Sequence, residues 1–159
     1  MSARKLARKA RLLRFVLNLY PPYLGAGVRV RHIAPDFREV RVKMVLSRLN
    51  RNYVGTQFGG SLYSMTDPFF MLMLMHNLGR DYIVWDKAAN IEFVSPGKGP
   101  VYADFHIDQR LLDDIRAQTA GGDKYLPKLH AEVRDGEGTL VARVQKTLYV
   151  RLKPRARAA

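Results

Sequence analysis

The fold of this protein is decided by residues 58–79, which read FGGSLYSMTDPFFMLMLMHNLG. Large apolar side chains leave this stretch almost no polar face, and a helix that is apolar all round is typical of a buried helix. Pro68 lacks a backbone N–H, so the helix should kink there or start again with Asp67 as its cap. Gly79 suits the C-terminal cap. The sequence therefore predicts one long central helix that needs apolar cover on every side.

The segments on either side of this helix alternate between apolar and polar residues, which is the pattern of strands with one buried face. Two such segments precede the helix and four follow it, at residues 28–31, 40–46, 82–94, 101–107, 129–134 and 140–150. A turn at residues 135–138 joins the last two into a hairpin, and residues 111–122 form a short helix or a loop. A curved antiparallel sheet wrapped around the central helix would bury it, so the pattern predicts an α+β domain.

A further helix is predicted near the N-terminus, at residues 3–20. Leu6, Ala10, Leu13 and Leu17 recur at spacings of four, three and four, which places them on one stripe, and a Pro-Pro pair follows. The opposite face of this helix is expected to be entirely basic. Two interpretations stay open: a surface helix docked on the domain through the stripe, which is the commoner class, or a helix that lies on anionic lipid or RNA.

Positive charge gathers at the two ends of the chain. Of the net charge of +13, residues 1–14 contribute six basic side chains and residues 151–159 contribute four, with no acidic residue in either segment. We therefore expect no nucleic-acid partner for the body and, at most, a peripheral membrane contact through the basic tails. The chain has no cysteine, which excludes disulfides and a cysteine nucleophile and suits a reducing cytoplasm. No histidine or acidic pair has metal-ligand spacing, so no metal site is expected.

Residues 52–67 read NYVGTQFGGSLYSMTD and resemble the active-site stretch of hotdog-fold thioesterases. The nearest likeness is to the phenylacetyl-CoA thioesterase-like branch, which has Asn, Gly, a His-Gly-Gly triplet and an acidic residue in this order. Asn52, Gly55, Gly59, Gly60 and Asp67 match that pattern position for position. The segment 85–87 together with the methionine-rich helix also resembles an uncharacterised thioesterase-like branch. The element order agrees too, so the resemblance spans residues 25–152.

The resemblance implies a hotdog fold for a single domain over residues 1–159, with a helix at 1–20, the hotdog core at 25–152 and a basic tail at 153–159. It also implies a thioesterase that hydrolyses fatty or aromatic acyl groups carried by coenzyme A or by acyl-carrier protein. No cofactor is implied beyond the coenzyme A of the substrate. In the family the active site forms between protomers, so we expect a homodimer or a tetramer built from such dimers.

The chemistry expected of this motif also follows from the residue types. Backbone amides at Gly59 and Gly60, at the start of a buried helix, can stabilise the oxyanion that develops on a thioester carbonyl. Asp67 follows about two helical turns later and can act as base or nucleophile, with Asn52 as a positioning group. The side chains expected to contact the substrate are Gln57, Phe58, Tyr63, Phe69, Phe70, Met71, Leu72, Met75 and Lys87.

Each of these residues also has a purely structural interpretation. Asp67 can cap a second helical segment, and the pair at Gly59 can be a close-packing turn. Asn52 can be a turn residue, and Lys87 a solvated charge at the edge of a strand. The methionines can fill the core instead of lining an acyl site.

The departure from the family pattern lies at Phe58, where the family has its histidine. A phenyl ring can neither donate nor accept a proton, so Gln57 becomes the candidate donor to the thioester carbonyl, from a different direction. This substitution motivates a second hypothesis, a non-catalytic acyl-binding or lipid-binding module on the same scaffold. The four histidines lie outside the motif, which disfavours a hydratase.

Overall fold

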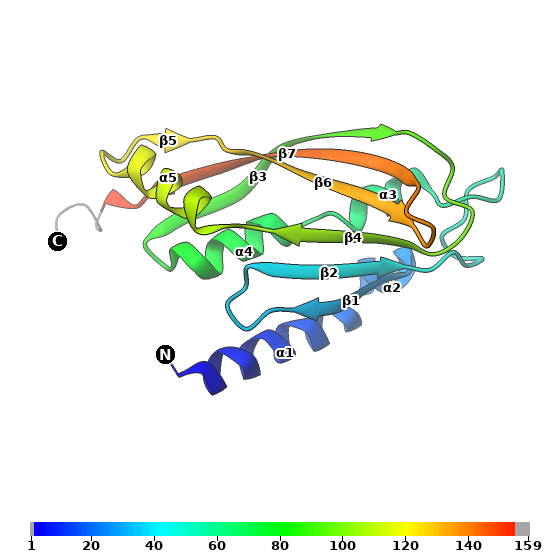
Figure 1. The fold of residues 1–159 in the computed structure, drawn as a ribbon, viewed down its shortest axis with the longest axis horizontal. Coiled ribbons are helices and arrows are strands. Elements are labelled where there is room, and N and C mark those ends of the chain that lie inside the picture. Colours follow the sequence, from blue (N-terminus) through cyan, green and yellow to red (C-terminus); the bar gives the residue numbers. More distant parts are fainter. Residues whose placement is uncertain (1, 155–159) are drawn as a thin grey trace.

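The computed structural model describes residues 2–154, and its strands form one seven-stranded sheet (Figure 1). The strand order is β1-β2-β4-β6-β7-β3, the pairings among the described strands are antiparallel, and a two-residue strand, β5, lies beside β7. All six predicted strands are present, whereas β5 was not predicted. The strands are β1 (Val28–Ile33), β2 (Glu39–Met44), β3 (Tyr82–Phe93), β4 (Val101–His106), β5 (Lys124–Tyr125), β6 (Lys128–Asp135) and β7 (Leu140–Leu152).

The predicted central helix is present in two parts, around which the sheet curves (Figure 1). It breaks at residues 65–68 and restarts after Pro68, as the proline predicts. The expectation that Asp67 caps the second part is wrong, because α4 has no side-chain cap and the Asp67 carboxylate binds a lysine instead. The helices of the described chain are α1 (Ala3–Leu19), α2 (Pro21–Ala26), α3 (Gly59–Ser64), α4 (Phe69–Leu78) and α5 (Gln109–Thr119).

The core lies between α4 and the concave face of the sheet. Phe69 and Phe70 both pack on Phe105 of β4, with ring centres 5.0 and 5.2 Å apart. The prediction that the helix is buried all round is not met within one chain, because Met75 is 47% exposed and Met71 is only half-buried. The sheet covers one side of α4 and leaves the other side partly open.

Helix α1 docks on the domain through the predicted stripe, in which Ala10 and Leu17 are buried. The side chain of Asn18 fastens the helix to β1: its Oδ1 accepts from the Val30 N–H at 2.8 Å, and its Nδ2 donates to the Val30 carbonyl at 3.0 Å. The proline pair ends α1 as predicted, but it also begins α2, because the first helical positions need no N–H donor. The outward face of α1 is not entirely basic, since it exposes Leu12, Phe15, Val16 and Leu19.

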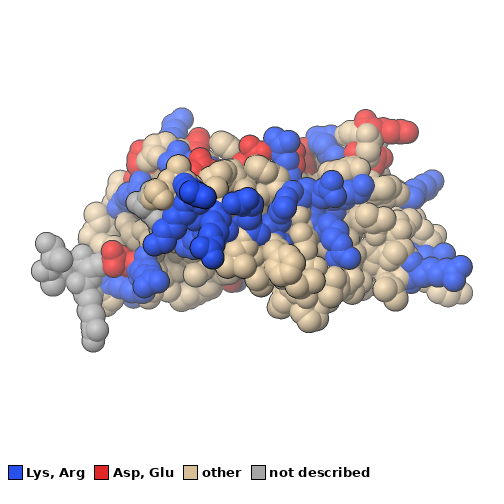
Figure 2. All heavy atoms as spheres, turned by 90° about the horizontal axis from the view of Figure 1, so that it is seen from below, with Lys and Arg blue, Asp and Glu red and all other residues tan. Residues whose placement is uncertain are grey.

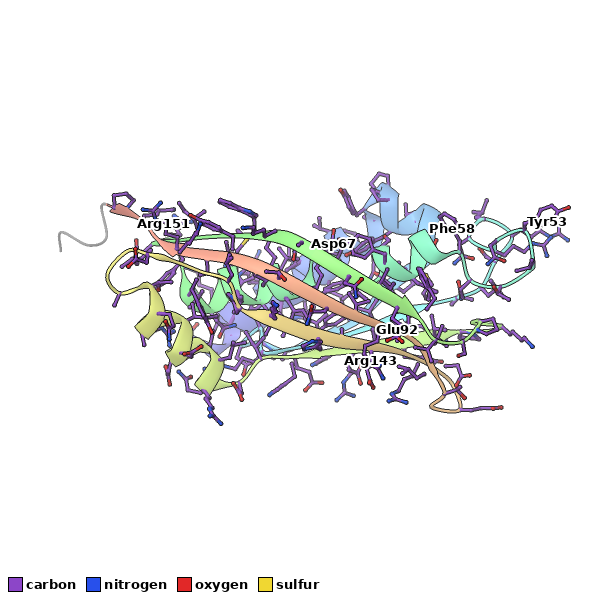
Figure 3. All side chains as sticks on the ribbon, turned by 90° about the horizontal axis from the view of Figure 1, so that it is seen from above. Tyr53, Phe58, Asp67, Glu92, Arg143 and Arg151 are labelled. Carbon is purple, nitrogen blue, oxygen red and sulfur yellow. The ribbon has the colours of Figure 1, made fainter. Side chains whose placement is uncertain are left out.

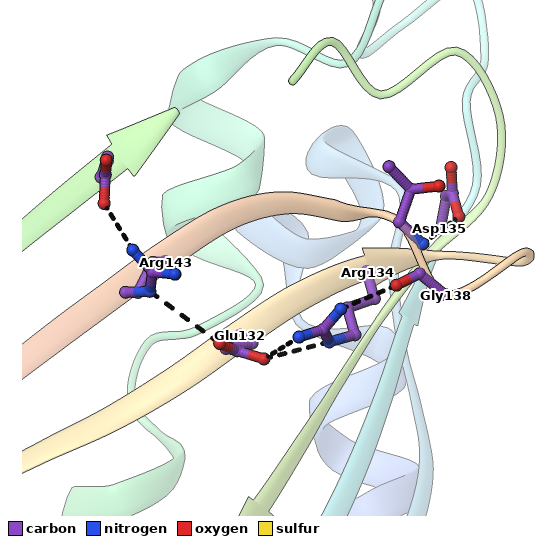
Figure 4. Close-up of polar contacts among 7 residues, drawn as sticks. Glu132, Arg134, Asp135, Gly138 and Arg143 are labelled. Carbon is purple, nitrogen blue, oxygen red and sulfur yellow. Dashed lines mark hydrogen bonds and ion pairs between the residues drawn. The ribbon is translucent and has the colours of Figure 1, made fainter. Parts of the chain in front are cut away.

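The convex face of the sheet carries a row of exposed ion pairs across three strands (Figure 4). Arg143 on β7 lies 3.0 Å from Glu92 on β3 and 3.9 Å from Glu132 on β6. Glu132 also binds Arg134 on its own strand. Each side chain in this row is well exposed, so water screens the attraction and the row adds little stability.

The described residues include no helix that is long and apolar enough to cross a membrane. The predicted basic tail at residues 153–159 lies mostly outside the described residues, which end at Pro154.

Candidate functional site

Lys146 lies on the concave face of β7, where the neighbouring inward positions are apolar. Ala142, Val144, Leu148 and Val150 share this face, and all four are fully buried. Lys146 is itself 0% exposed. A lysine is almost never fully buried unless its charge is paired, because removing the ammonium from water is costly. The sheet therefore requires countercharges at this point of the core.

Two carboxylates and a phenol surround the Lys146 ammonium. Its Nζ lies 2.6 Å from Oδ1 of Asp67 and 3.4 Å from Oδ1 of Asp86. It also lies 3.3 Å from the Tyr63 hydroxyl and 4.9 Å from the centre of the Tyr63 ring, which adds a cation–π contact. We call these four residues the Lys146 cluster.

A bulge in β3 accompanies the placement of Asp86 in the cluster. Asp86 pairs in register with the inward-facing Leu148, and the register shifts immediately afterwards, so that Lys87 is the extra residue. Directly opposed residues of an antiparallel pair share a face of the sheet, so Asp86 points inward. Bulges of this kind re-aim side chains and are common beside active sites.

The two buried charges of the cluster have shifted pKa values. Burial raises the pKa of Asp86 from 3.8 to about 6; attraction to Lys146 opposes this shift, and the neighbouring Asp67 carboxyl group adds to it. Burial alone would lower the pKa of Lys146, but the hydrogen bond to Asp67 and the attraction of both carboxylates outweigh burial and raise it. A pKa of about 6 lies well above the ordinary range of a carboxyl group, and such shifts are common among catalytic groups.

Asp67 is both anchored and accessible. Its side chain is 42% exposed, whereas the side chain of its partner Lys146 is 1% exposed. The hydroxyl of Tyr23, a phenol whose pKa burial raises, donates to the Asp67 backbone carbonyl. Figure 3 shows Asp67 near the middle of the molecule and Phe58 further towards the loop that carries Tyr53. The carboxylate is thus fixed on its protein side and open to solvent on the other.

A second group of predicted site residues lines a separate hollow of about 340 Å³ at the start of α3. Asp67 and Lys146 do not line this hollow. One chain therefore brings Asn52, Gln57 and Gly59 together but leaves Asp67 apart from them. The lining consists of Asn52, Thr56, Gln57, Gly59, Leu62 and residues 93–97.

The Asn52 amide closes a tight turn beside this hollow. Its Oδ1 accepts from the Thr56 N–H at 3.0 Å, and its Nδ2 donates to the Thr56 hydroxyl at 2.9 Å. Such hydrogen bonds are typical of an asparagine in a turn. Of the two interpretations of Asn52, the contacts within this chain support the turn residue.

Gln57 is buried, and its side-chain amide already forms a hydrogen bond within the chain. Nε2 donates one of its two N–H groups to the Gly99 carbonyl at 3.0 Å, and the residue is only 3% exposed, which restricts the access of a thioester carbonyl. Oε1 is buried and has no hydrogen-bond partner among residues 2–154. The expectation that Gln57 replaces the family histidine as donor therefore meets a competing bond.

The absence of side chains at Gly59 and Gly60 leaves room for two aromatic rings. A Cβ added to Gly59 would lie 2.9 Å from the Phe93 ring, and one added to Gly60 would lie 2.4 Å from the Phe58 ring, both closer than real Cβ contacts. Phe58 itself precedes α3 and is 55% exposed. The close-packing interpretation of the pair is therefore supported, and the Phe58 ring lies over the start of the helix.

The remaining predicted substrate contacts divide between core and surface. Phe69 and Phe70 are 1% and 2% exposed and serve the core, so the expectation that they line an acyl site is not met within this chain. Met71 is half-buried on the open side of α4, and Lys87 is exposed at the bulge of β3. Within residues 2–154 no group of three or more His, Asp or Glu is placed to hold a metal ion.

Sequence reasoning missed Lys146 and Asp86. Lys146 carried a readable signal, because it occupies an inward position in the alternating run 140–150, where every other such residue from Ala142 onward is apolar. Asp86 carried no such signal, because its inward direction is tied to a bulge that periodicity does not reveal.

A family model described as a domain of unknown function, DUF4442, matches residues 8–150. The chain belongs to the DUF4442 family. No curated protein sequence matches this DUF4442 protein significantly.

Solved structures similar to this DUF4442 protein have the hotdog fold of the thioesterase superfamily. A protein of unknown function from Pseudomonas aeruginosa matches with a TM-score of 0.77 at 19% identity, over 89% of this chain and 95% of that one. A thioesterase from Haemophilus influenzae matches with a TM-score of 0.65 at 14% identity, over 89% of each chain. The Escherichia coli PaaI protein, from the phenylacetic acid degradation operon, matches with a TM-score of 0.61 at 13% identity, over 93% of this chain and 95% of that one. The predicted hotdog fold is confirmed.

Proposed function

We propose that this DUF4442 protein hydrolyses acyl thioesters of coenzyme A or acyl-carrier protein, with Asp67 as general base or nucleophile. The observation that carries the proposal is the half-exposed Asp67 carboxylate held 2.6 Å from the buried Lys146 ammonium. A carboxylate fixed in this way keeps one orientation toward an incoming group, which is the preorganisation that a base or a nucleophile needs. The match of Asp67 to the family motif supports the same role, and the Haemophilus influenzae thioesterase among the similar structures supports thioester hydrolysis in general.

The proposed reaction needs one carboxylate and one water molecule. As a general base, Asp67 takes a proton from water while the water oxygen bonds to the carbonyl carbon; the C–S bond then breaks, and the proton passes to the departing sulfur. As a nucleophile, Asp67 bonds to the carbonyl carbon and the C–S bond breaks, which releases the thiolate and leaves a mixed anhydride; water then hydrolyses the anhydride, and the proton that the water gives up passes to the thiolate. Both routes yield a carboxylic acid and a free thiol. The candidate oxyanion donors are backbone amides at the start of α3, near Gly59 and Gly60.

A second copy of the chain is part of the proposal, because the two halves of the predicted site lie apart in one chain. The twelve-residue strand β3 is at the edge of the sheet, and such an edge is a ready template for pairing. Trp85 and Phe93 on β3 are 45% and 56% exposed, and Met75 on α4 is 47% exposed. Pairing of β3 with its counterpart would cover these apolar groups. In the proposed dimer, the hollow of one copy meets the Lys146 cluster of the other.

The open side of α4 favours apolar acyl groups. Met71, Leu72 and Met75 are half-buried or exposed there, and methionine adapts to acyl chains of varied shape. We therefore propose fatty or aromatic acyl groups as the substrate class.

Thiol release from a panel of acyl-CoA esters tests the proposal. The chain has no cysteine, so a thiol-reactive dye detects only the released coenzyme A. Asp67→Asn should lower the rate by roughly a hundredfold to ten-thousandfold, as expected when a general base is lost. Asp104→Asn, which neutralises an exposed carboxylate on β4, is the matched control and should keep the wild-type rate. Equal rates for Asp67→Asn and wild type would remove Asp67 from the mechanism.

The second candidate function is acyl binding without turnover, and Phe58 is the observation that favours it. Its ring stands where the family histidine would act and packs closely over Gly60. A thioether analogue of acyl-CoA cannot be hydrolysed, so a rise in melting temperature with this analogue reports binding alone. Such a rise, combined with no thiol release from any ester, would establish the binding function in place of the enzyme.

A further inference from the structure

We propose that the outward face of α1 and the start of α2 form a docking surface for an anionic phospholipid bilayer. Residues 3–26 carry six basic side chains and no acidic one. The same segment exposes a run of large apolar side chains between 42% and 61%: Leu12, Phe15, Val16, Leu19, Tyr20 and Leu24. We call these apolar side chains, together with Arg4, Arg8 and Arg11, the α1 surface.

The α1 surface is ordered along the helix. Arg4, Arg8, Leu12, Phe15 and Leu19 follow at spacings of four, four, three and four, so they form one row that faces away from the docked stripe. The first turns of this row are basic and its last turns are apolar. Basic side chains followed by exposed apolar ones along one face let that face contact both anionic headgroups and the apolar boundary below them.

The charge of the surrounding face supports an anionic partner. Figure 2 looks onto the side of the molecule that carries α1, and Lys and Arg side chains form a broad band across it beside an uncharged area, with Asp and Glu at the margins. Arg29 and Arg31 of the neighbouring strand β1 are exposed as well. Such a cluster is attracted to the negative surface of a bilayer that contains anionic lipid.

A hollow of about 440 Å³ lies between α1 and β1, next to the apolar end of the row. Arg14 and Arg31 line it together with Phe15, Leu19 and Val30. The side chain of Arg14 donates to the Arg31 carbonyl at 3.0 Å, which holds one guanidinium at the rim. Guanidinium groups beside apolar side chains suit a phosphate headgroup whose acyl chain begins close by.

Two other occupants fit this surface less well. A second copy docked through the same face would bring six positive charges against six, with no acidic residue in the segment to offset them. RNA would use the basic residues and the rings of Phe15 and Tyr20, but the exposed aliphatic side chains of Leu12, Val16 and Leu19 offer it neither a charge nor a stacking ring. A bilayer uses both parts of the surface.

Co-sedimentation of the full chain with vesicles tests the proposal. We expect binding to an equimolar mixture of phosphatidylcholine and phosphatidylglycerol, little binding to phosphatidylcholine alone, and weaker binding at high salt. Replacing Arg4, Arg8 and Arg11 together by Gln should weaken binding about a hundredfold, since each basic side chain contributes about a factor of five. Replacing Phe15 and Leu19 together by Ser should weaken it by roughly tenfold or more.

The matched control removes three exposed basic residues from elsewhere on the molecule, Arg110, Lys124 and Lys128, and it should bind much as the wild type does. An equal loss in this control would overturn the proposal, because the net charge and not the α1 surface would then be responsible. Binding of polyuridylate with no binding of either vesicle would also overturn it, in favour of RNA.

A fluorescence measurement keeps the test decisive if a multiple variant folds poorly. The chain has one tryptophan, Trp85, so Trp85→Phe combined with Phe15→Trp places the only indole on the α1 surface. We expect a blue shift of its emission when phosphatidylglycerol vesicles are added. An unchanged spectrum at saturating vesicle concentration would overturn the proposal.

Discussion

Arg143 and Lys146 lie three residues apart on β7 and point to opposite faces of the same sheet. Arg143, on the convex face, pairs with Glu92 and Glu132, and its side chain is 48% exposed. Lys146, on the concave face, pairs with the two carboxylates of its cluster, and its side chain is 1% exposed. Strand alternation alone makes one cation a surface group and the other a buried one.

The comparison shows that burial, and not the number of ion pairs, decides what a charge does. Water and side-chain entropy reduce an exposed pair such as Arg143–Glu92 to between zero and about 1 kcal/mol. A pair with one buried partner, such as Lys146–Asp67, has a larger desolvation cost and a larger attraction, so removing the carboxylate leaves the buried ammonium uncompensated. Only the buried pair holds a carboxylate in a fixed position for chemistry.

The largest expected effect is that of Lys146→Met, which leaves Asp67 and Asp86 without their countercharge. We expect the free energy of unfolding to fall by about 3 kcal/mol, the lower end for a broken buried pair, because Asp67 is partly hydrated. Urea denaturation monitored by circular dichroism measures the change. Thiol release should fall as well, since Asp67 loses its anchor.

Two further variants test whether the loss of stability comes from the unpaired carboxylates. Lys128→Met removes an exposed lysine from the adjacent strand β6 and should change stability by no more than about 0.5 kcal/mol. Adding Asp67→Asn and Asp86→Asn to Lys146→Met should restore much of the lost stability, because no unpaired charge then stays buried. If Lys146→Met alone is as stable as wild type, the contrast with Arg143 is lost.

An intermediate effect is expected from Asp86→Asn, and it depends on pH. Folding raises the pKa of Asp86 from 3.8 to about 6, so the folded state binds this proton more tightly than the unfolded state. The resulting stabilisation is fully present below pH 3.8 and is lost as the pH rises through about 6. Asp86→Asn cannot ionise, so the melting temperature of the variant minus that of wild type should increase over this range. A difference that is independent of pH would show that Asp86 does not titrate there.

The smallest effect is expected from Arg143→Gln on the convex face. We expect the free energy of unfolding to change by less than about 1 kcal/mol and thiol release to stay at the wild-type rate. The stability difference should shrink further in high salt, because the Arg143 ion pairs are exposed. A loss as large as that of Lys146→Met would overturn the distinction between the two faces.

Much of the fold could be predicted because its signals are local. The alternating segments became strands, the apolar run became the central helix, and Pro68 marked the break within it. The errors fell where local signals end: β5 has two residues, α2 begins at the prolines that end α1, and one side of α4 stays partly open in a single chain.

The candidate site was predicted less completely than the fold. The motif drew attention to Asp67, and within one chain this residue lies apart from the hollow that Asn52 and Gly59 line. The partner of Asp67 is Lys146, 79 residues away in sequence, and no motif joins the two positions. The resemblance pointed to the region, and only packing identified the contact.

The sequence by itself determined that a long apolar helix is covered by an antiparallel sheet and that the N-terminal helix is strongly basic. These properties follow from side-chain periods of 3.6 and 2, which can be read within a dozen residues. Only the tertiary structure decided that Lys146, Asp67 and Asp86 meet and that α1 turns an apolar row outward. These contacts and orientations depend on strand register, on a bulge and on which face of an element is docked. Packing between segments far apart in the chain determines all three.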